Sequence, residues 1–317
     1  MACSLLTAAG ASAQPAPAWP TRPVTLVIPY GLGGAGDTVG RLIAQKLTAE
    51  FGQNFITVNK TGAGGLVAAN DVARAQPDGY TLFISSMGEL ILANAIDQNS
   101  SLNPVKDFTH IAFFGGSPAV IFSNPALLPA KNLKELVAYS KANPGKPDFG
   151  LAAYGSSGHL VSTLLQREAH ITFNYVPYRG GNDTLTSVLG GHIPIAAFTI
   201  STAGKQIENG RVRGLAVSSA HRMPLFPNVP TFAEQGFPDI VLSGWYGLSG
   251  PAHMPPDIVK KLNAAVVKAM EQPELREAYK NLTLELPPPY DAAAFTAFVA
   301  RETARWTPIA QSIHVQQ

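Results

Sequence analysis

Residues that carry metal or thiol chemistry are scarce in this chain of 317 residues. The only cysteine is Cys3, so removal of the N-terminus would leave no thiol, and no Cys-x-x-Cys motif occurs. The seven histidines are scattered and form no His-Glu-x-x-His pattern, which is the usual arrangement of zinc ligands on a helix. We therefore expect no metal site and no cofactor.

Charged residues are also few, at 14% of the chain, and the net charge is only +2. No strong electrostatic field therefore favours nucleic acid or an anionic membrane, and we expect no nucleic-acid partner. Hydrophobic residues make up 46%, which indicates a folded globular protein. No window after the N-terminus holds the roughly 18 to 20 uninterrupted apolar residues of a membrane span.

Residues 1–19 are predicted to be a signal peptide and a disordered start. The stretch is short and apolar, and Ala11-Ser12-Ala13 fits a cleavage site that would leave Gln14 as the mature N-terminus. A basic region before the apolar stretch is missing, so a disordered Ala-rich tail is the alternative interpretation. The cleavage site predicts export.

Short apolar runs followed by glycine turns and helical patterns indicate βαβ units and a parallel sheet. We predict strands at Val24–Pro29, Phe55–Val58 and Thr81–Ile84 and helices at 38–47 and 66–74. Asp37 is placed as the N-cap of the first helix, and Asn182 or Asp183 as the cap of a later one.

The pattern restarts near residue 123, which predicts two lobes. Residues 111–123 are apolar and long enough to pass between them, and 240–248 is predicted to be a returning segment. We expect lobe 1 to comprise residues 20–122 and 245–317, and lobe 2 residues 123–244. Further elements are expected as strands at 148–153, 171–176, 193–198 and 214–217, and as helices at 133–141, 159–168, towards 189, 256–270, 273–280 and 292–303.

Three glycine-rich turns, Gly31–Gly36, Gly62–Gly65 and Tyr154–Gly158, follow strands and open helices. The first turn of a helix has backbone N–H groups without partners and a partial positive charge. Such turns hold carboxylates or phosphates without Lys or Arg. One turn from each lobe could bind opposite sides of one anion. The alternative is that each glycine only permits a tight turn.

Two enzyme classes fit these turns poorly. Gly31–Gly36 reads as a dinucleotide-binding G-x-G-x-x-G, but the next strand ends at Val58-Asn59-Lys60 without the acidic residue that binds ribose. Gly155-Ser156-Ser157-Gly158-His159 is not the G-x-S-x-G of hydrolases. His159 is better explained as a packing or capping residue than as a general base.

Several motifs, in order along the chain, resemble one family. They are Pro29-Tyr30 through Arg41, Gly62–Gly65, Pro77–Leu82, Gly155–Leu160, Val176–Gly181, Leu215–Ser218, Val229–Thr231 and Gly244–Leu248. The chain resembles Bug-type receptors, the solute-binding component of tripartite tricarboxylate transporters, from about Trp19 to Trp306. The resemblance implies an α/β type II periplasmic-binding-protein fold, with two lobes joined by hinge strands and a ligand cleft between them.

The resemblance also implies which residues bind a carboxylate, partly through ordered water. The expected ligand-binding residues are Tyr30, Leu32, Gly33, Gly34, Ala35, Ser85, Ser86, Met87, Tyr154, Gly155, Ser157, Gly158 and Thr199. Family members often have a hydroxyl residue where this chain has Ala35 or Gly36, and often have Asp where it has Thr199. Thr199 argues against an amino-acid ligand.

The function implied is a periplasmic receptor, expected to be a monomer and not an enzyme, that delivers a small organic carboxylate to transporter membrane subunits. An exported ligand sensor, or an enzyme acting on a carboxylate, is the alternative.

Overall fold

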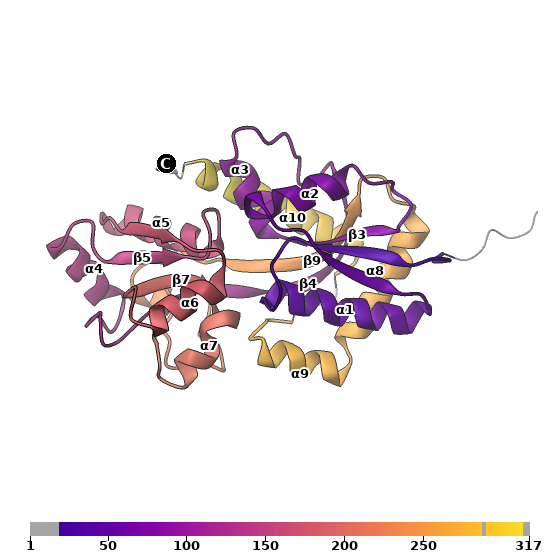
Figure 1. Ribbon diagram of the computed structural model, residues 1–317. Coiled ribbons are helices and arrows are strands. Elements are labelled where there is room, and N and C mark those ends of the chain that lie inside the picture. Colours follow the sequence, from indigo (N-terminus) through magenta and orange to yellow (C-terminus); the bar gives the residue numbers. More distant parts are fainter. Residues whose placement is uncertain (1–18, 287–289, 313–317) are drawn as a thin grey trace, which may run out of the picture.

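The computed structural model describes residues 19–286 and 290–312 of the chain. Two α/β lobes lie side by side and are joined by the long strands β4 (Phe108–Ser123) and β9 (Ser243–Pro251) (Figure 1). The predicted cleavage site at residues 11–13 lies outside the described residues. The predicted α/β class is confirmed.

The first lobe is built on a mixed sheet. Strands β2 (Phe55–Asn59), β1 (Val24–Ile28) and β3 (Thr81–Ser86) are parallel, and β9 pairs antiparallel with β3. Apolar residues alternate between the two faces, as the strand period requires. Leu26 belongs to the core under α1 (Ala35–Phe51) and α8 (Pro256–Met270), whereas Val27 belongs to the core under α2 (Leu66–Ala73) and α10 (Ala292–Gln311).

Strand β4 changes partners partway along its length. Residues 108–118 pair with β9, and residues 119–123 pair with β7 (Ile195–Thr199). Strand β8 (Arg213–Val217) pairs with the same end of β4, while β5 (Asp148–Leu151) lies parallel to both β7 and β6 (Asn174–Pro177). One strand therefore passes continuously from the first lobe into the second.

The remaining helices cover the sheet or connect its strands. In the second lobe they are α4 (Leu133–Ala142), α5 (Ser157–Ala169), α6 (Gly181–Leu189), α7 (Ile200–Glu208) and the short η3 (Ala233–Gln235). In the first lobe they are η1 (Ala63–Gly65), a π-helical turn η2 (Gly88–Ala93), α3 (Asn94–Ile96) and α9 (Pro273–Asn281).

Some predicted boundaries are wrong. Helix α1 begins at Ala35 with Gly34 as its N-cap, so Asp37 lies inside the first turn. Helix α6 begins at Gly181 after Gly180, and neither Asn182 nor Asp183 caps it. In both cases the glycine adopts the extended backbone that precedes the helix, which places the polar residues within the first turn. Strand β6 starts only at Asn174, and η2, α3 and α7 are elements that the sequence pattern did not predict.

Candidate ligand-binding site

A cavity of about 140 Å³ lies where the two lobes meet. Both lobes and the connecting strand β9 contribute to its walls. The lining residues are Tyr30, Ser86, Met87, Gly88, Leu92, Ser156, Ser157, Thr199, Gly244, Trp245 and Tyr246. Five of the predicted ligand-binding residues are therefore brought together: Tyr30, Ser86, Met87, Ser157 and Thr199.

The second lobe directs two helix N-termini at this cavity. Ser156 is the N-cap of α5, where its hydroxyl accepts a hydrogen bond from the backbone N–H of His159 at 3.2 Å, and Ser157 is the first residue of that helix. Thr199 is the N-cap of α7. The N–H groups and dipoles of these helices favour negative charge. Among the described residues that line the cavity, none is Lys or Arg, so an anion would be held without an ion pair.

The first lobe contributes a cluster around the carboxylate of Glu89. This side chain is completely buried. Its Oε2 accepts hydrogen bonds from the Tyr30 hydroxyl at 3.0 Å and from Ser86 Oγ at 2.6 Å, and its Oε1 accepts one from the Ser86 N–H. Burial raises the pKa of Glu89 to about 7, against the opposing effect of the hydrogen bonds from Ser86 and Tyr30. Burial, reinforced by the Glu89 charge, also raises the pKa of Tyr30 well above its ordinary value.

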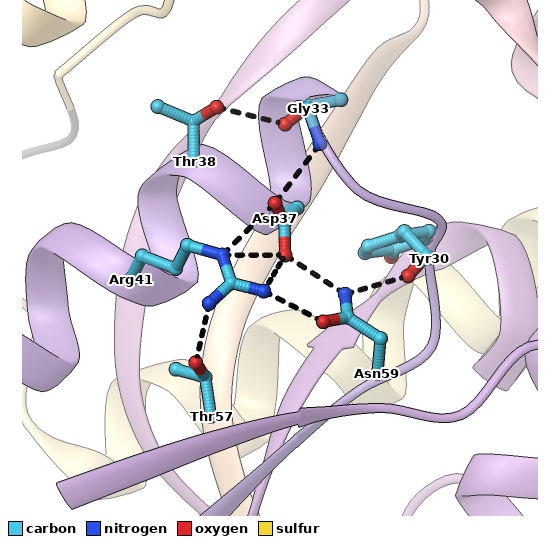
Figure 2. Close-up of polar contacts among 8 residues, drawn as sticks. Tyr30, Gly33, Asp37, Thr38, Arg41, Thr57 and Asn59 are labelled. Atoms are coloured by element: carbon cyan, nitrogen blue, oxygen red, sulfur yellow. Dashed lines mark hydrogen bonds and ion pairs between the residues drawn. The ribbon is translucent and has the colours of Figure 1, made fainter.

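Asp37 fixes the turn between β1 and α1 (Figure 2). Its carboxylate accepts hydrogen bonds from the Gly33 N–H at 3.0 Å, from the Arg41 guanidinium at 3.0 Å and from the Asn59 amide at 2.8 Å. The same Asn59 amide donates to the carbonyl oxygen of Tyr30. The turn is thus tied to the neighbouring strand β2 by a buried carboxylate.

The backbone N–H of Gly33 is paired with Asp37 in this structure, so it is not a free donor here. Gly33 itself adopts a φ of 79°, which favours glycine. Leu32, Gly33, Gly34 and Ala35 do not belong to the residues that line the cavity, and the Leu32 side chain is 74% exposed.

Ser85, another predicted ligand-binding residue, does not line the cavity in this structure. Its side chain is fully buried, and its hydroxyl lies 2.8 Å from Ser249 Oγ, which in turn lies 2.9 Å from Nδ1 of His110. This hydroxyl belongs to a chain of hydrogen bonds within the core and is not available to the cavity.

The turn before α5 is held by His159. Its Nδ1 accepts the Gly155 N–H at 3.1 Å, and its ring packs edge-on against Tyr154 and Tyr175. Burial lowers the pKa of His159 to about 4, so the ring is neutral. The prediction that His159 is a packing residue is confirmed. Tyr154 and Gly155 flank this turn, outside the cavity lining.

Several parts of the site could not be recognised from single residues of the sequence. Ser156 and Glu89 received no role, and Gly244, Trp245 and Tyr246 were noted only for their resemblance to the family motif. Tyr246 packs edge-on against Tyr30, with 6.0 Å between ring centroids. The signal that could have found Gly244, Trp245 and Tyr246 is the Gly-Trp-Tyr-Gly motif on a strand predicted to return between the lobes.

Comparisons with known proteins identify the family. Residues 39–315 match the model of the tripartite tricarboxylate transporter family receptor. The chain belongs to this family. It is 30% identical to Protein BugT of Bordetella pertussis over 308 residues, which cover 96% of this chain and 93% of that protein.

Solved structures of similar proteins share the whole fold. MatC from Rhodopseudomonas palustris with bound malate is 32% identical and superposes with a TM-score of 0.85, over 92% of this chain and 100% of that one. Another R. palustris protein, solved with adipate, is 30% identical with a TM-score of 0.86, over 92% of this chain and 97% of that one. The receptor therefore has the two-lobed periplasmic-binding-protein fold that the sequence predicted, and the receptors of this family are periplasmic.

Two kinds of feature are absent from the described residues. No helix there is both long enough and apolar enough to cross a membrane. Within the same residues, His, Cys, Asp and Glu form no group of three that could hold a metal ion.

Proposed function

We propose that this receptor binds a small organic carboxylate in the cavity between its lobes and delivers it to the membrane subunits of a transporter. The observation that carries the proposal is the convergence of the α5 and α7 N-termini on one cavity, lined by hydroxyl and aromatic side chains but, within the described chain, by no basic one. The malate and adipate bound to two relatives support the same ligand class.

The direct contacts we propose come from the five predicted residues that already line the cavity, together with Ser156. Leu32, Gly33, Gly34, Ala35, Tyr154, Gly155 and Gly158 lie in the two turns and would reach the ligand, directly or through water, when the lobes close. The proposed lobes are residues 20–122 with 245–317 and residues 123–244. Closure would bend β4 after Pro118, where its pairing partner changes from β9 to β7.

We also propose that the chain is cleaved after Ala13 during export and acts in the periplasm as a monomer. N-terminal sequencing of periplasmic protein and sedimentation analysis test these statements. The cavity is proposed to bind without turnover, so mass spectrometry should recover the ligand unchanged after long incubation. Turnover that is lost in Ser157→Ala would overturn this part of the proposal.

The deciding experiment is a thermal-shift screen of the mature chain against mono-, di- and tricarboxylates, with amines and neutral sugars of similar size as controls. A ligand at one hundred times its dissociation constant adds about 2.7 kcal/mol to the free energy of unfolding. We expect stabilisation by one or more carboxylates and by no control compound. Stabilisation confined to the amines or sugars would contradict the proposal.

A further inference from the structure

The carboxylate of Glu89 lies directly behind two residues of the cavity wall. Tyr30 and Ser86 both line the cavity, and both hydroxyls donate to Glu89 Oε2. We propose that Glu89 is a positioning residue that makes these two hydroxyls hydrogen-bond acceptors towards the cavity, so that the receptor prefers a carboxylate bearing a hydroxyl group to its counterpart without one. This inference rests on the proposed function.

The number of protons in the cluster decides which groups can donate. An ionised carboxylate only accepts hydrogen bonds, and each hydroxyl has a single proton to donate. Tyr30 and Ser86 both direct that proton at Glu89. Ser86 Oγ also accepts the Gly88 N–H at 3.0 Å, which leaves that N–H paired as well. What the Tyr30 and Ser86 hydroxyls can offer a ligand is therefore oxygen lone pairs.

The opposite wall of the cavity offers hydrogen-bond donors. The Thr199 hydroxyl accepts a hydrogen bond from Ser201 Oγ at 3.1 Å, so its own proton is free to be donated. Ser157 stands at the first position of α5, where N–H groups point out of the helix. A carboxylate is stabilised at this wall, next to α5 and α7, and repelled by the charge of Glu89 at the other.

A ligand that satisfies both walls needs an acceptor group at one end and a donor at the other. A carboxylate with a hydroxyl group on a nearby carbon has both. A carboxylate without the hydroxyl would leave the lone pairs of Tyr30 and Ser86 unpaired or facing a trapped water. A second carboxylate at that wall would face Glu89 and be disfavoured by like charge.

The test compares matched acids that differ by one hydroxyl group: malate with succinate, lactate with propionate, and citrate with tricarballylate. Titration calorimetry at pH 8, where Glu89 is ionised, gives the ratio of the two dissociation constants for each pair. For wild type we expect the hydroxy acid to bind about three- to tenfold more tightly in each pair that binds.

Glu89→Gln is the decisive variant. The glutamine amide can donate to one of the two hydroxyls, whose own proton is then released towards the cavity, so the ratio should fall towards one. Ser86→Ala should lower the ratio too. Ser85→Ala is its matched control, because that serine lies next to Ser86 on β3 but bonds to Ser249, and its ratio should stay at the wild-type value.

Because the ratio is taken within one variant, a general loss of stability affects both ligands alike and cancels. Should Glu89→Gln fail to fold, Tyr30→Phe and Ser86→Ala measure the same ratio. A wild-type ratio near one, or a preference that persists in Glu89→Gln, overturns the inference while leaving the carboxylate receptor intact. If no carboxylate binds at all, the proposed function is wrong and this inference falls with it.

Discussion

A β-carbon placed on Gly158 would lie 1.9 Å from the carbonyl oxygen of Ala197. The first turn of α5 therefore rests directly on the backbone of β7. Because the backbone fixes the position of a β-carbon and the atoms it would meet are main-chain atoms, no side-chain rotation could relieve the contact. This close approach brings the N-terminus of α5 to the cavity, so Gly158 has a packing role in addition to any contact with ligand.

We predict that Gly158→Ala lowers the free energy of unfolding by about 2 kcal/mol or more, because the added methyl group must displace backbone. Urea denaturation followed by circular dichroism measures the change. Gly31→Ala is the control: a β-carbon there would meet no atom within 4 Å, and the change should stay within about 0.5 kcal/mol. Equal stability of the two variants would contradict the packing role.

The sheet and most helices could be predicted because their signals are local. A few residues are enough to predict an element in two clear cases. The apolar run at Val24–Ile28 predicts a strand, and the glycines before α2 predict a turn into a helix. Asp37 is an example of a contact that local signals cannot predict. Its partner Asn59 lies 22 residues away on β2, and nothing near Asp37 in the sequence indicates that its carboxylate is taken up by a neighbouring strand.

The site was harder to predict than the fold because it depends on which face a side chain occupies. Ser85 and Ser86 are adjacent, and strand alternation sends them to opposite faces. Both were expected to contact ligand, but only Ser86 lines the cavity. Glu89 was missed because its burial depends on how η2 packs within the first lobe. No repeat of apolar residues marks η2 in the sequence.

Asp37→Asn should destabilise the protein by about 2 kcal/mol at pH 7, because an amide cannot accept from Arg41, Asn59 and Gly33 together. Urea denaturation tests this. Asp71→Asn is the control, since the ion pair of Asp71 with Lys60 is solvent-exposed and its loss should cost under about 1 kcal/mol.

The same carboxylate predicts an acid dependence. Burial raises the pKa of Asp37, but the hydrogen bonds from Arg41, Asn59 and Gly33 outweigh it and hold the pKa below its ordinary value. A lowered folded-state pKa contributes stability above the unfolded value, about 3.9, that is lost as the pH falls through the folded value. The difference between wild type and Asp37→Asn should therefore shrink below about pH 4. A constant difference from pH 7 to pH 3 would argue against the assignment.

Substitutions of the two serines at the start of α5, Ser156 and Ser157, should affect stability and ligand binding differently. Ser156→Ala removes the helix cap and should lower the free energy of unfolding by about 1 kcal/mol. Ser157→Ala should leave stability within about 0.5 kcal/mol and weaken binding of a carboxylate found in the screen by about two- to tenfold. Thermal melts and calorimetric titration of both variants give the comparison. Unchanged carboxylate affinity in Ser157→Ala would show that the hydroxyl of Ser157 does not contact the ligand.

His159 predicts a loss of stability in mild acid. Its Nδ1 can accept the Gly155 N–H only while that nitrogen is unprotonated, and burial lowers its pKa to about 4. Between pH 6.5 and 4 the unfolded chain takes up a proton at this residue that the folded chain does not. The free energy of unfolding therefore decreases as the pH decreases, by up to about 1.4 kcal/mol per pH unit for each such histidine.

His110 behaves in the same way, because burial also lowers its pKa to about 4. The two histidines should thus act together in wild type. Urea denaturation between pH 7.5 and 4.5 gives the slope of the free energy of unfolding against pH. His159→Gln should remove the contribution of one histidine from this slope, and the double variant His159→Gln with His110→Gln should remove the contributions of both. His159→Gln should also loosen the Gly155 turn, so the variant is expected to be less stable at pH 7.5, where neither state is protonated. A slope as steep in the double variant as in wild type would mean that these rings are charged in the folded protein, which their burial and the Gly155 hydrogen bond argue against.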